Sequence, residues 1–108
     1  MRFTFALLSL LTFSSIVSAG ECVPLSKVKA DAMAIFKDAT MAEMGGTEAS
    51  AFLASLNAMP PKTDVRGDYV LAVTVPRKAV ILVMFINGCA GATSAIPERV
   101  FHLLLQAL

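Results

Sequence analysis

The sequence predicts a small α+β domain in which helices pack on one face of a two-stranded antiparallel hairpin, in the order helix, helix, strand, strand, helix. Three observations lead to this prediction. Apolar residues recur at helical spacing before residue 60 and again after residue 97. Between these stretches, a short turn beginning at Pro76 separates two runs rich in β-branched residues. No repeat, low-complexity tract or interdomain linker divides the chain.

The beginning of the chain has the pattern of an export signal. Arg2 gives it a positive start, and an apolar run over residues 3–13 follows. This run is shorter than the roughly 20 apolar residues that a membrane-spanning helix needs. We therefore expect a cleavable signal peptide, with an uncleaved anchor as the alternative, and a protein that is secreted or periplasmic in a bacterial cell.

Small residues define the expected cleavage site. Val17-Ser18-Ala19 fits the pocket of a signal peptidase, so cleavage is expected after Ala19, with Gly20 as the second choice. The predicted organisation is a signal peptide at 1–19 and one small domain at 20–108.

The charges of the remaining chain balance. Arg2 is the only charged residue of the leader, so residues 20–108 carry eight basic and eight acidic side chains. Nucleic-acid binders carry a basic patch or stripe, and attachment to anionic lipid also needs excess positive charge. The composition therefore argues against a nucleic-acid partner and against a stable membrane anchor after cleavage.

Two helices are predicted first. Ser26 is a suitable N-cap, and the apolar residues that follow predict a helix that continues to about Met44. Gly45-Gly46 should end this helix. Thr47 is the N-cap expected for a second, shorter helix, which Pro60-Pro61 closes.

The hairpin and the last helix follow. Strands are predicted at Tyr69–Val75 and Ala79–Ile86, then a flexible loop at residues 87–91, then a helix with Pro97 in its first turn. Because Ala79–Ile86 is apolar on both faces, and a two-stranded sheet is marginal alone, something should cover its second face or open edge. The last helix, a second copy or another partner could do so. The side chains of this predicted interaction surface are Tyr69, Leu71, Val73, Val80, Leu82 and Met84.

The two cysteines, Cys22 and Cys89, are predicted to form one disulfide. An even pair usually does so in an oxidising compartment. Neither belongs to a Cys-x-x-Cys motif, which argues against a redox or nucleophilic thiol.

Other residues with chemical potential favour structural interpretations. His102 shares a polar stripe with Arg99 and Gln106 and is expected to be exposed and inert, because no catalytic partner or metal-ligand set can be assigned to it. Arg66-Gly67-Asp68 resembles the integrin-recognition tripeptide, but a turn entering a strand favours Gly and Asp anyway. The methionines of the helical region suit core filling, with an adaptable binding surface or soft-metal ligation as alternatives. These methionines are Met33, Met41, Met44 and Met59.

Three functional hypotheses remain, and none includes a cofactor, a metal or an assigned catalytic residue. The leading hypothesis is a non-enzymatic binding or interaction module outside the cytoplasm. The second is a self-associating structural domain, a homodimer formed through the 69–86 hairpin. The third is a small secreted hydrolase or redox enzyme, which lacks an identifiable reactive group.

Overall fold

The computed structural model describes residues 21–108, so the predicted signal peptide and its cleavage site at Ala19 or Gly20 lie outside the described residues. The described chain is an α+β domain with three helices and a four-stranded antiparallel sheet. The elements are α2 (Leu25–Ile35), β1 (Thr40–Gly45), α3 (Gly46–Ala58), β2 (Tyr69–Val75), β3 (Ala79–Ile86), β4 (Cys89–Ile96) and α4 (Glu98–Gln106).

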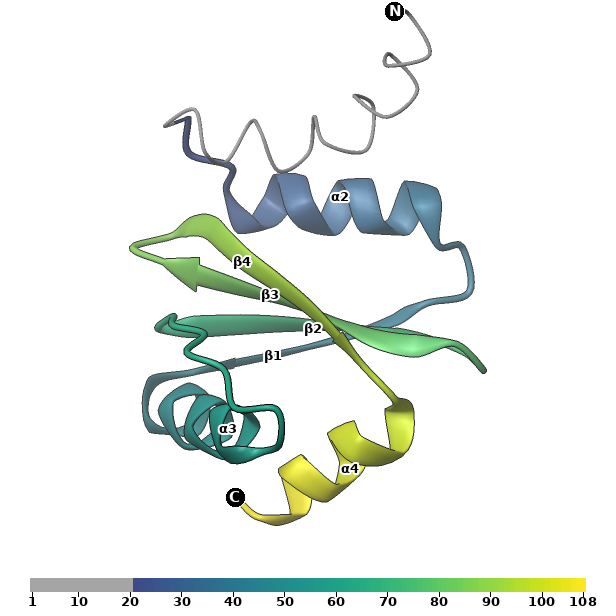
Figure 1. Cartoon of the computed structure of the whole chain (residues 1–108). Coiled ribbons are helices and arrows are strands. Elements are labelled where there is room, and N and C mark those ends of the chain that lie inside the picture. Colours follow the sequence, from purple (N-terminus) through teal and green to yellow (C-terminus); the bar gives the residue numbers. More distant parts are fainter. Residues whose placement is uncertain (1–20) are drawn as a thin grey trace, which may run out of the picture.

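The sheet has the strand order β1-β2-β3-β4, and every neighbouring pair is antiparallel. Helix α2 lies over one face, whereas α3 and α4 lie against the other (Figure 1). The fold therefore has three layers, and the predicted hairpin forms the two central strands.

Alternation along the central strands supplies two separate apolar cores. The face covered by α3 and α4 receives Val70 and Ala72 from β2, and these meet Phe52 and Phe101 of the two helices. The rings of Phe52 and Phe101 pack edge to face with their centroids 5.8 Å apart. The face covered by α2 receives the intervening side chains, which pack against Val28. Both faces of β2 and β3 are thus covered within one chain.

The prediction of a single helix up to Met44 is wrong. Helix α2 ends at Ile35, the chain turns at residues 36–39, and Thr40–Gly45 forms strand β1. Met, Ala and Glu in this strand are good helix formers. Their pairing with β2 overrides that preference, because it buries Met44 in the core between the sheet and α3.

The prediction of only two strands, with helices on one side, is also wrong. Cys89–Ile96 is a fourth strand, and the β3–β4 connection is a tight turn in which Asn87 and Gly88 have φ of 54° and 82°. Positive φ at both central residues is the geometry for which Asn-Gly is favoured. The predicted second helix, the two central strands and the last helix are confirmed in type and approximate position.

Candidate functional site

The six side chains predicted as an interaction surface lie on opposite faces of the sheet. Val80, Leu82 and Met84 point toward α3 and α4, and each has an exposed fraction of 0%. Leu71 and Val73, also buried, point toward α2, and only Tyr69 is half-buried. Five of these six side chains are therefore core residues of this domain.

The 69–86 hairpin has no open edge either. Strand β1 pairs with β2 over its whole length, and β4 pairs with β3, so both central strands have neighbours on each side. An edge-to-edge contact with another molecule would have to use β1 or β4.

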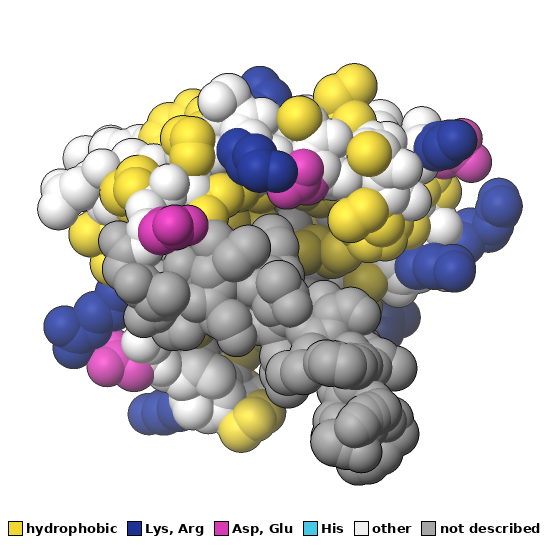
Figure 2. Space-filling model, turned by 90° about the horizontal axis from the view of Figure 1, so that it is seen from above, with side chains coloured by type: hydrophobic (Ala, Val, Ile, Leu, Met, Phe, Trp, Pro, Cys, Tyr) yellow, Lys and Arg dark blue, Asp and Glu magenta, His cyan; other side chains and the backbone are white. Residues whose placement is uncertain are grey.

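The α2 side of the sheet is the less completely covered side. Met41, Val75 and Ile81 pack on this core but remain half-buried. On α2 itself, Met33 and Ile35 expose 63% and 68% of their surface. Figure 2 looks onto this side and shows hydrophobic side chains distributed around a few charged ones. These residues define the α2-side surface.

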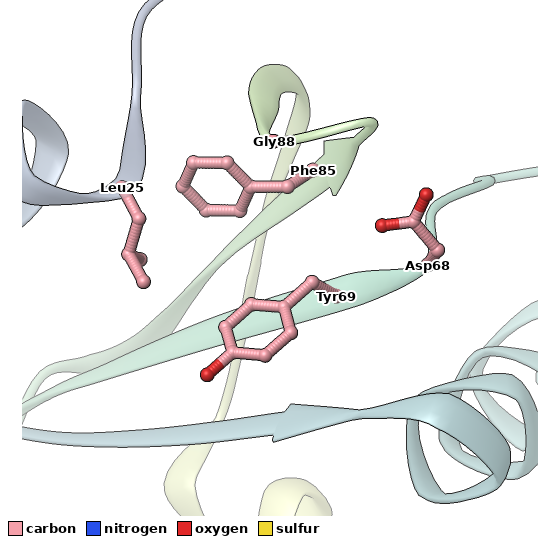
Figure 3. Close-up of a pocket in the computed structure, with 5 residues that line it drawn as sticks. All are labelled: Leu25, Asp68, Tyr69, Phe85 and Gly88. Atoms are coloured by element: carbon pink, nitrogen blue, oxygen red, sulfur yellow. The ribbon is translucent and has the colours of Figure 1, made fainter.

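A pocket of about 240 Å³ opens at one end of this surface. Its lining residues are Leu25, Asp68, Tyr69, Phe85 and Gly88. Figure 3 shows Tyr69 and Phe85 on adjacent strands, Leu25 approaching from the start of α2, and the Asp68 carboxylate at the entrance to β2. The two rings meet edge to face with centroids 6.5 Å apart. The pocket therefore combines aromatic and aliphatic walls with one carboxylate.

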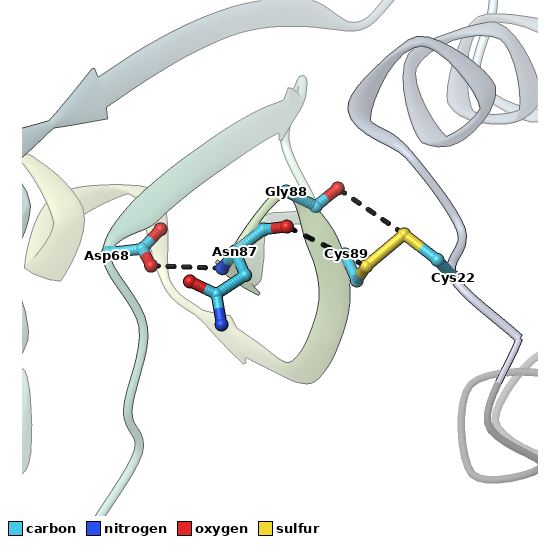
Figure 4. The surroundings of a disulfide bond; sticks show 5 residues. All are labelled: Cys22, Asp68, Asn87, Gly88 and Cys89. Atoms are coloured by element: carbon cyan, nitrogen blue, oxygen red, sulfur yellow. Dashed lines mark hydrogen bonds between the residues drawn. A yellow bond between two sulfur atoms is a disulfide. The ribbon is translucent and has the colours of Figure 1, made fainter.

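Asp68 holds the rim of this pocket in place. Its Oδ2 accepts a hydrogen bond of 3.0 Å from the backbone N–H of Asn87, in the turn between β3 and β4 (Figure 4). Gly67, just before it, lies so close to β3 that an added Cβ would stand 3.0 Å from the Cβ of Met84. Within residues 21–108, none of the ion pairs involves Asp68. Asp68 therefore stands at the rim of an otherwise apolar pocket and supports the β3–β4 turn.

A carboxylate between two donors links α2 to the sheet. Glu43 of β1 accepts a hydrogen bond of 2.6 Å from Lys29 Nζ of α2 and another of 2.6 Å from Tyr69 Oη of β2. These bonds, that of Lys29 foremost, lower the pKa of Glu43 below its usual 4.5. The hydrogen bond to Glu43 raises the pKa of Tyr69 above its usual 10.0. The network fixes the orientation of the Tyr69 ring that lines the pocket.

The predicted disulfide between Cys22 and Cys89 is present. It brings the start of the described chain against the start of β4, with the two Cα atoms 4.9 Å apart (Figure 4). The N–H of Ala90 donates a 2.9 Å hydrogen bond to the carbonyl of Val23, and Pro24 bridges to Cys89. The disulfide thus anchors the segment that leads into α2 and the pocket.

The three residues of the integrin-like tripeptide, Arg66-Gly67-Asp68, all contact neighbouring residues of the domain. Arg66 pairs with Asp64 at 3.2 Å on the surface, Gly67 packs on β3, and Asp68 supports the β3–β4 turn. These contacts give each of the three residues a structural role in the approach to β2.

The methionines of the helical region do not form one cluster. Met44 and Met59 belong to the core under α3, Met41 lies on the opposite face, and Met33 is exposed on α2. They therefore do not converge on one site.

His102 is exposed on α4, and its Nε2 lies 3.6 Å from Oε2 of Glu98. Over residues 21–108, no group of three or more His, Cys, Asp or Glu side chains could hold a metal ion. No helix in the same range is long and apolar enough to cross a membrane.

Comparison of the chain with known protein families, curated proteins and solved structures gave no match.

Sequence reasoning missed the pocket and the Lys29–Glu43–Tyr69 network. Both depend on which strands are neighbours, and β1 was assigned to a helix. One local signal was available, because Asn87-Gly88 directly follows a strong strand and is the dipeptide that two-residue hairpin turns favour.

Proposed function

We propose that this protein is an exported, non-enzymatic binding module that acts in the periplasm or outside the cell and uses its α2-side surface to bind another protein. The observation that carries the proposal is the pocket lined by Tyr69, Phe85 and Asp68 at the end of an incompletely covered apolar face. The leader-like sequence at residues 1–19 and the Cys22–Cys89 disulfide are consistent with export.

The chemistry of the surface suggests the kind of segment it would bind. Half-buried Met41, Val75 and Ile81 offer apolar contact, and Met side chains adapt to varied partners. At the pocket, a long basic side chain would place its aliphatic stem against Leu25 and its charge near the Asp68 carboxylate. The aromatic rings there add a cation–π attraction. We therefore expect a partner segment that presents apolar residues and one Lys or Arg.

Site-specific photo-crosslinking in the producing cell tests this proposal. A photoreactive phenylalanine analogue at Val75 probes the α2-side surface, and the same analogue at Leu103 probes the opposite side, where Leu103 is 59% exposed on α4. The Val75 probe is expected to give one discrete adduct of higher mass, and the Leu103 probe none. No adduct at Val75, or the same adducts at both positions, would refute the proposal.

A substitution distinguishes recognition by the pocket from nonspecific apolar binding. Asp68→Asn keeps an acceptor for the Asn87 N–H but removes the charge. In the Val75 probe background it should reduce the adduct severalfold, since the basic side chain loses its counter-charge. An undiminished adduct would exclude the basic contact while leaving the apolar face as the binding surface.

A further inference from the structure

The turn between β2 and β3 holds an arginine in a backbone conformation that favours glycine. This turn is closed by a 3.0 Å hydrogen bond that the N–H of Lys78 donates to the carbonyl of Val75. Arg77, the third residue of the turn, has a φ of 62°. Proline at the second position, here Pro76, and a positive φ at the third are features of a type II turn, in which glycine or asparagine is usual at the third position. An arginine there costs folding free energy, and residues with such a cost cluster at functional sites.

Arg77 belongs to a group of three exposed basic side chains. Lys78 follows it in the same turn, and Lys37 lies in the connection between α2 and β1. Both connections lie at the same end of the sheet, because Thr40 at the start of β1 pairs with Thr74 near the end of β2 (Figure 1). We call Lys37, Arg77 and Lys78 the cationic tip.

The charge of the cationic tip is local and is not neutralised by ion pairs. Within residues 21–108, no ion pair includes Lys37, Arg77 or Lys78, whereas three other basic side chains pair with carboxylates. Asp38 is the acidic residue of the same two connections, so the cations there outnumber the anions. Figure 2 shows Lys and Arg side chains gathered at the right-hand end of the molecule. A chain that is neutral over residues 20–108 therefore has a positive end.

The cationic tip adjoins the apolar part of the α2-side surface. Val75 directly precedes the turn, and Phe36 and Ala39 of the α2–β1 connection pack on the same core as Val75. The pocket with Tyr69 and Asp68 lies at the other end of β2. At the rise of an extended strand, the two ends of β2 are about 20 Å apart. The surface thus has a carboxylate at one end, apolar side chains along it and cations at the other end.

We propose that the partner segment bound by the α2-side surface carries an acidic residue, Asp or Glu, where it reaches the cationic tip. The Lys or Arg expected at the pocket and this acidic residue would then lie about 20 Å apart, the length of roughly seven residues of extended chain. The reversed segment would place like charges together at both ends, so the charges also fix the direction in which the segment lies. This inference rests on the proposed function, because it names the chemistry of the partner of the same surface.

The surface as a whole favours a protein segment as the occupant. A polyanion or an anionic membrane would match the cationic tip, but it would not match the apolar side chains or the Asp68 carboxylate that complete the surface. A segment with one basic residue, apolar residues and one acidic residue matches all three parts.

Charge variants of the tip test the inference in the photo-crosslinking experiment with the probe at Val75. Arg77→Gln combined with Lys78→Gln should reduce the adduct at least about threefold, because two exposed ion pairs are lost. Arg77→Lys keeps the charge and should keep most of the adduct. Lys62→Gln is the matched control, since Lys62 is an exposed lysine that precedes β2 at the opposite end of the sheet, and it should leave the adduct unchanged.

Arg77→Gly distinguishes a role in binding from a role in the turn. Glycine adopts the positive φ without strain, so the purified variant should unfold at a higher urea concentration than the unmodified protein. In the cell it should nevertheless give less adduct from Val75, because the guanidinium is missing. An undiminished adduct from Arg77→Gly would overturn the inference.

The possible results separate this inference from the proposed function. No adduct at Val75 in the unmodified protein would refute both. An adduct that Asp68→Asn weakens, but that the double Arg77→Gln and Lys78→Gln variant leaves unchanged, would overturn the inference alone. An adduct with twice the mass of the chain would assign the surface to a second copy and would overturn it too. Circular dichroism and the intact mass would verify that every variant keeps the fold and the disulfide.

Discussion

Glu43 connects three elements through two hydrogen bonds. Its carboxylate lies between Lys29 of α2 and Tyr69 of β2, and it is itself part of β1. Because the pKa of Glu43 is lowered in the folded state, its contribution to stability is present above the usual value of 4.5 and is lost as the pH falls through the lower folded value. This position on the surface keeps the contribution small, since solvent and salt screen exposed ion pairs.

Tyr69 allows this network to be observed directly. It is the only tyrosine, and the chain has no tryptophan, so the absorbance change on forming tyrosinate reports a single residue. A spectrophotometric titration should give a pKa above 10.0, because ionised Tyr69 would repel Glu43 and lose the hydrogen bond. The contribution of Tyr69 to folding stability is therefore present at pH values below the pKa of the unfolded state. It is lost as the pH rises through the pKa of the folded state.

Glu43→Gln removes the negative charge and should return the Tyr69 titration toward its ordinary value. Glu21→Gln, at an exposed carboxylate outside any helix or strand, is the control and should leave the titration unchanged. An unmodified protein that titrates at 10.0 or lower would contradict the Tyr69–Glu43 contact, as would a titration that Glu43→Gln leaves unaltered.

At the scale of elements, some helices and strands are specified by their own hydrophobic periodicity, whereas others form only because they pair with a neighbouring strand. Strands β2 and β3 have apolar β-branched runs, and α4 has a one-sided apolar stripe, so their sequences predicted them. Four of the six residues of β1 are the good helix formers Met, Ala and Glu, and β4 between Cys89 and Ile96 consists of Ala, Gly, Ser and Thr with no apolar alternation. Neither can be recognised without its neighbour.

The candidate site could likewise be predicted from the sequence only in part. The disulfide followed from cysteine count and expected compartment, and the apolar excess of the hairpin correctly indicated that both its faces need cover. The sequence could not show that α2 covers one face, since that depends on where Cys22 anchors the chain. The pocket between α2 and the sheet was therefore beyond sequence reasoning.

The disulfide ties the segment that leads into α2 to strand β4, beside the backbone contacts of Val23 and Pro24. It closes a loop with a sequence separation of 67, so the chain-entropy relation gives a stabilisation of about 4 kcal/mol. Replacing both cysteines, Cys22→Ala with Cys89→Ala, should lower the free energy of unfolding by roughly this amount in urea titrations.

Reduction of the unmodified protein is the internal control for the double variant. Both should lower the unfolding midpoint to a similar extent, because each removes the same cross-link. A decrease in the free energy of unfolding of less than about 1 kcal/mol would contradict this prediction. It would show that the Val23–Ala90 hydrogen bond holds the segment without the covalent bond.

For the whole molecule, the shared central strands couple the two cores. Val70 faces α3 and α4, and the next residue, Leu71, faces α2, with the same alternation in β3. A strand cannot leave one core without leaving the other. We therefore expect cooperative two-state unfolding, in which damage to one face is felt on both.

Phe52→Leu tests this coupling from the face remote from Tyr69. Phe52 is fully buried and packs edge to face on Phe101, so the substitution should cost about 1–2 kcal/mol through lost volume and the lost aromatic pair. Far-ultraviolet circular dichroism and Tyr69 fluorescence, which reports the α2 side, should shift to the same lower denaturant midpoint. Leu103→Ala, at an exposed position on α4, should leave both midpoints nearly unchanged. If the Tyr69 transition stayed in place while the dichroism shifted, the layers would unfold separately. The half-covered α2 side would then be an independent unit rather than one surface of a single cooperative domain.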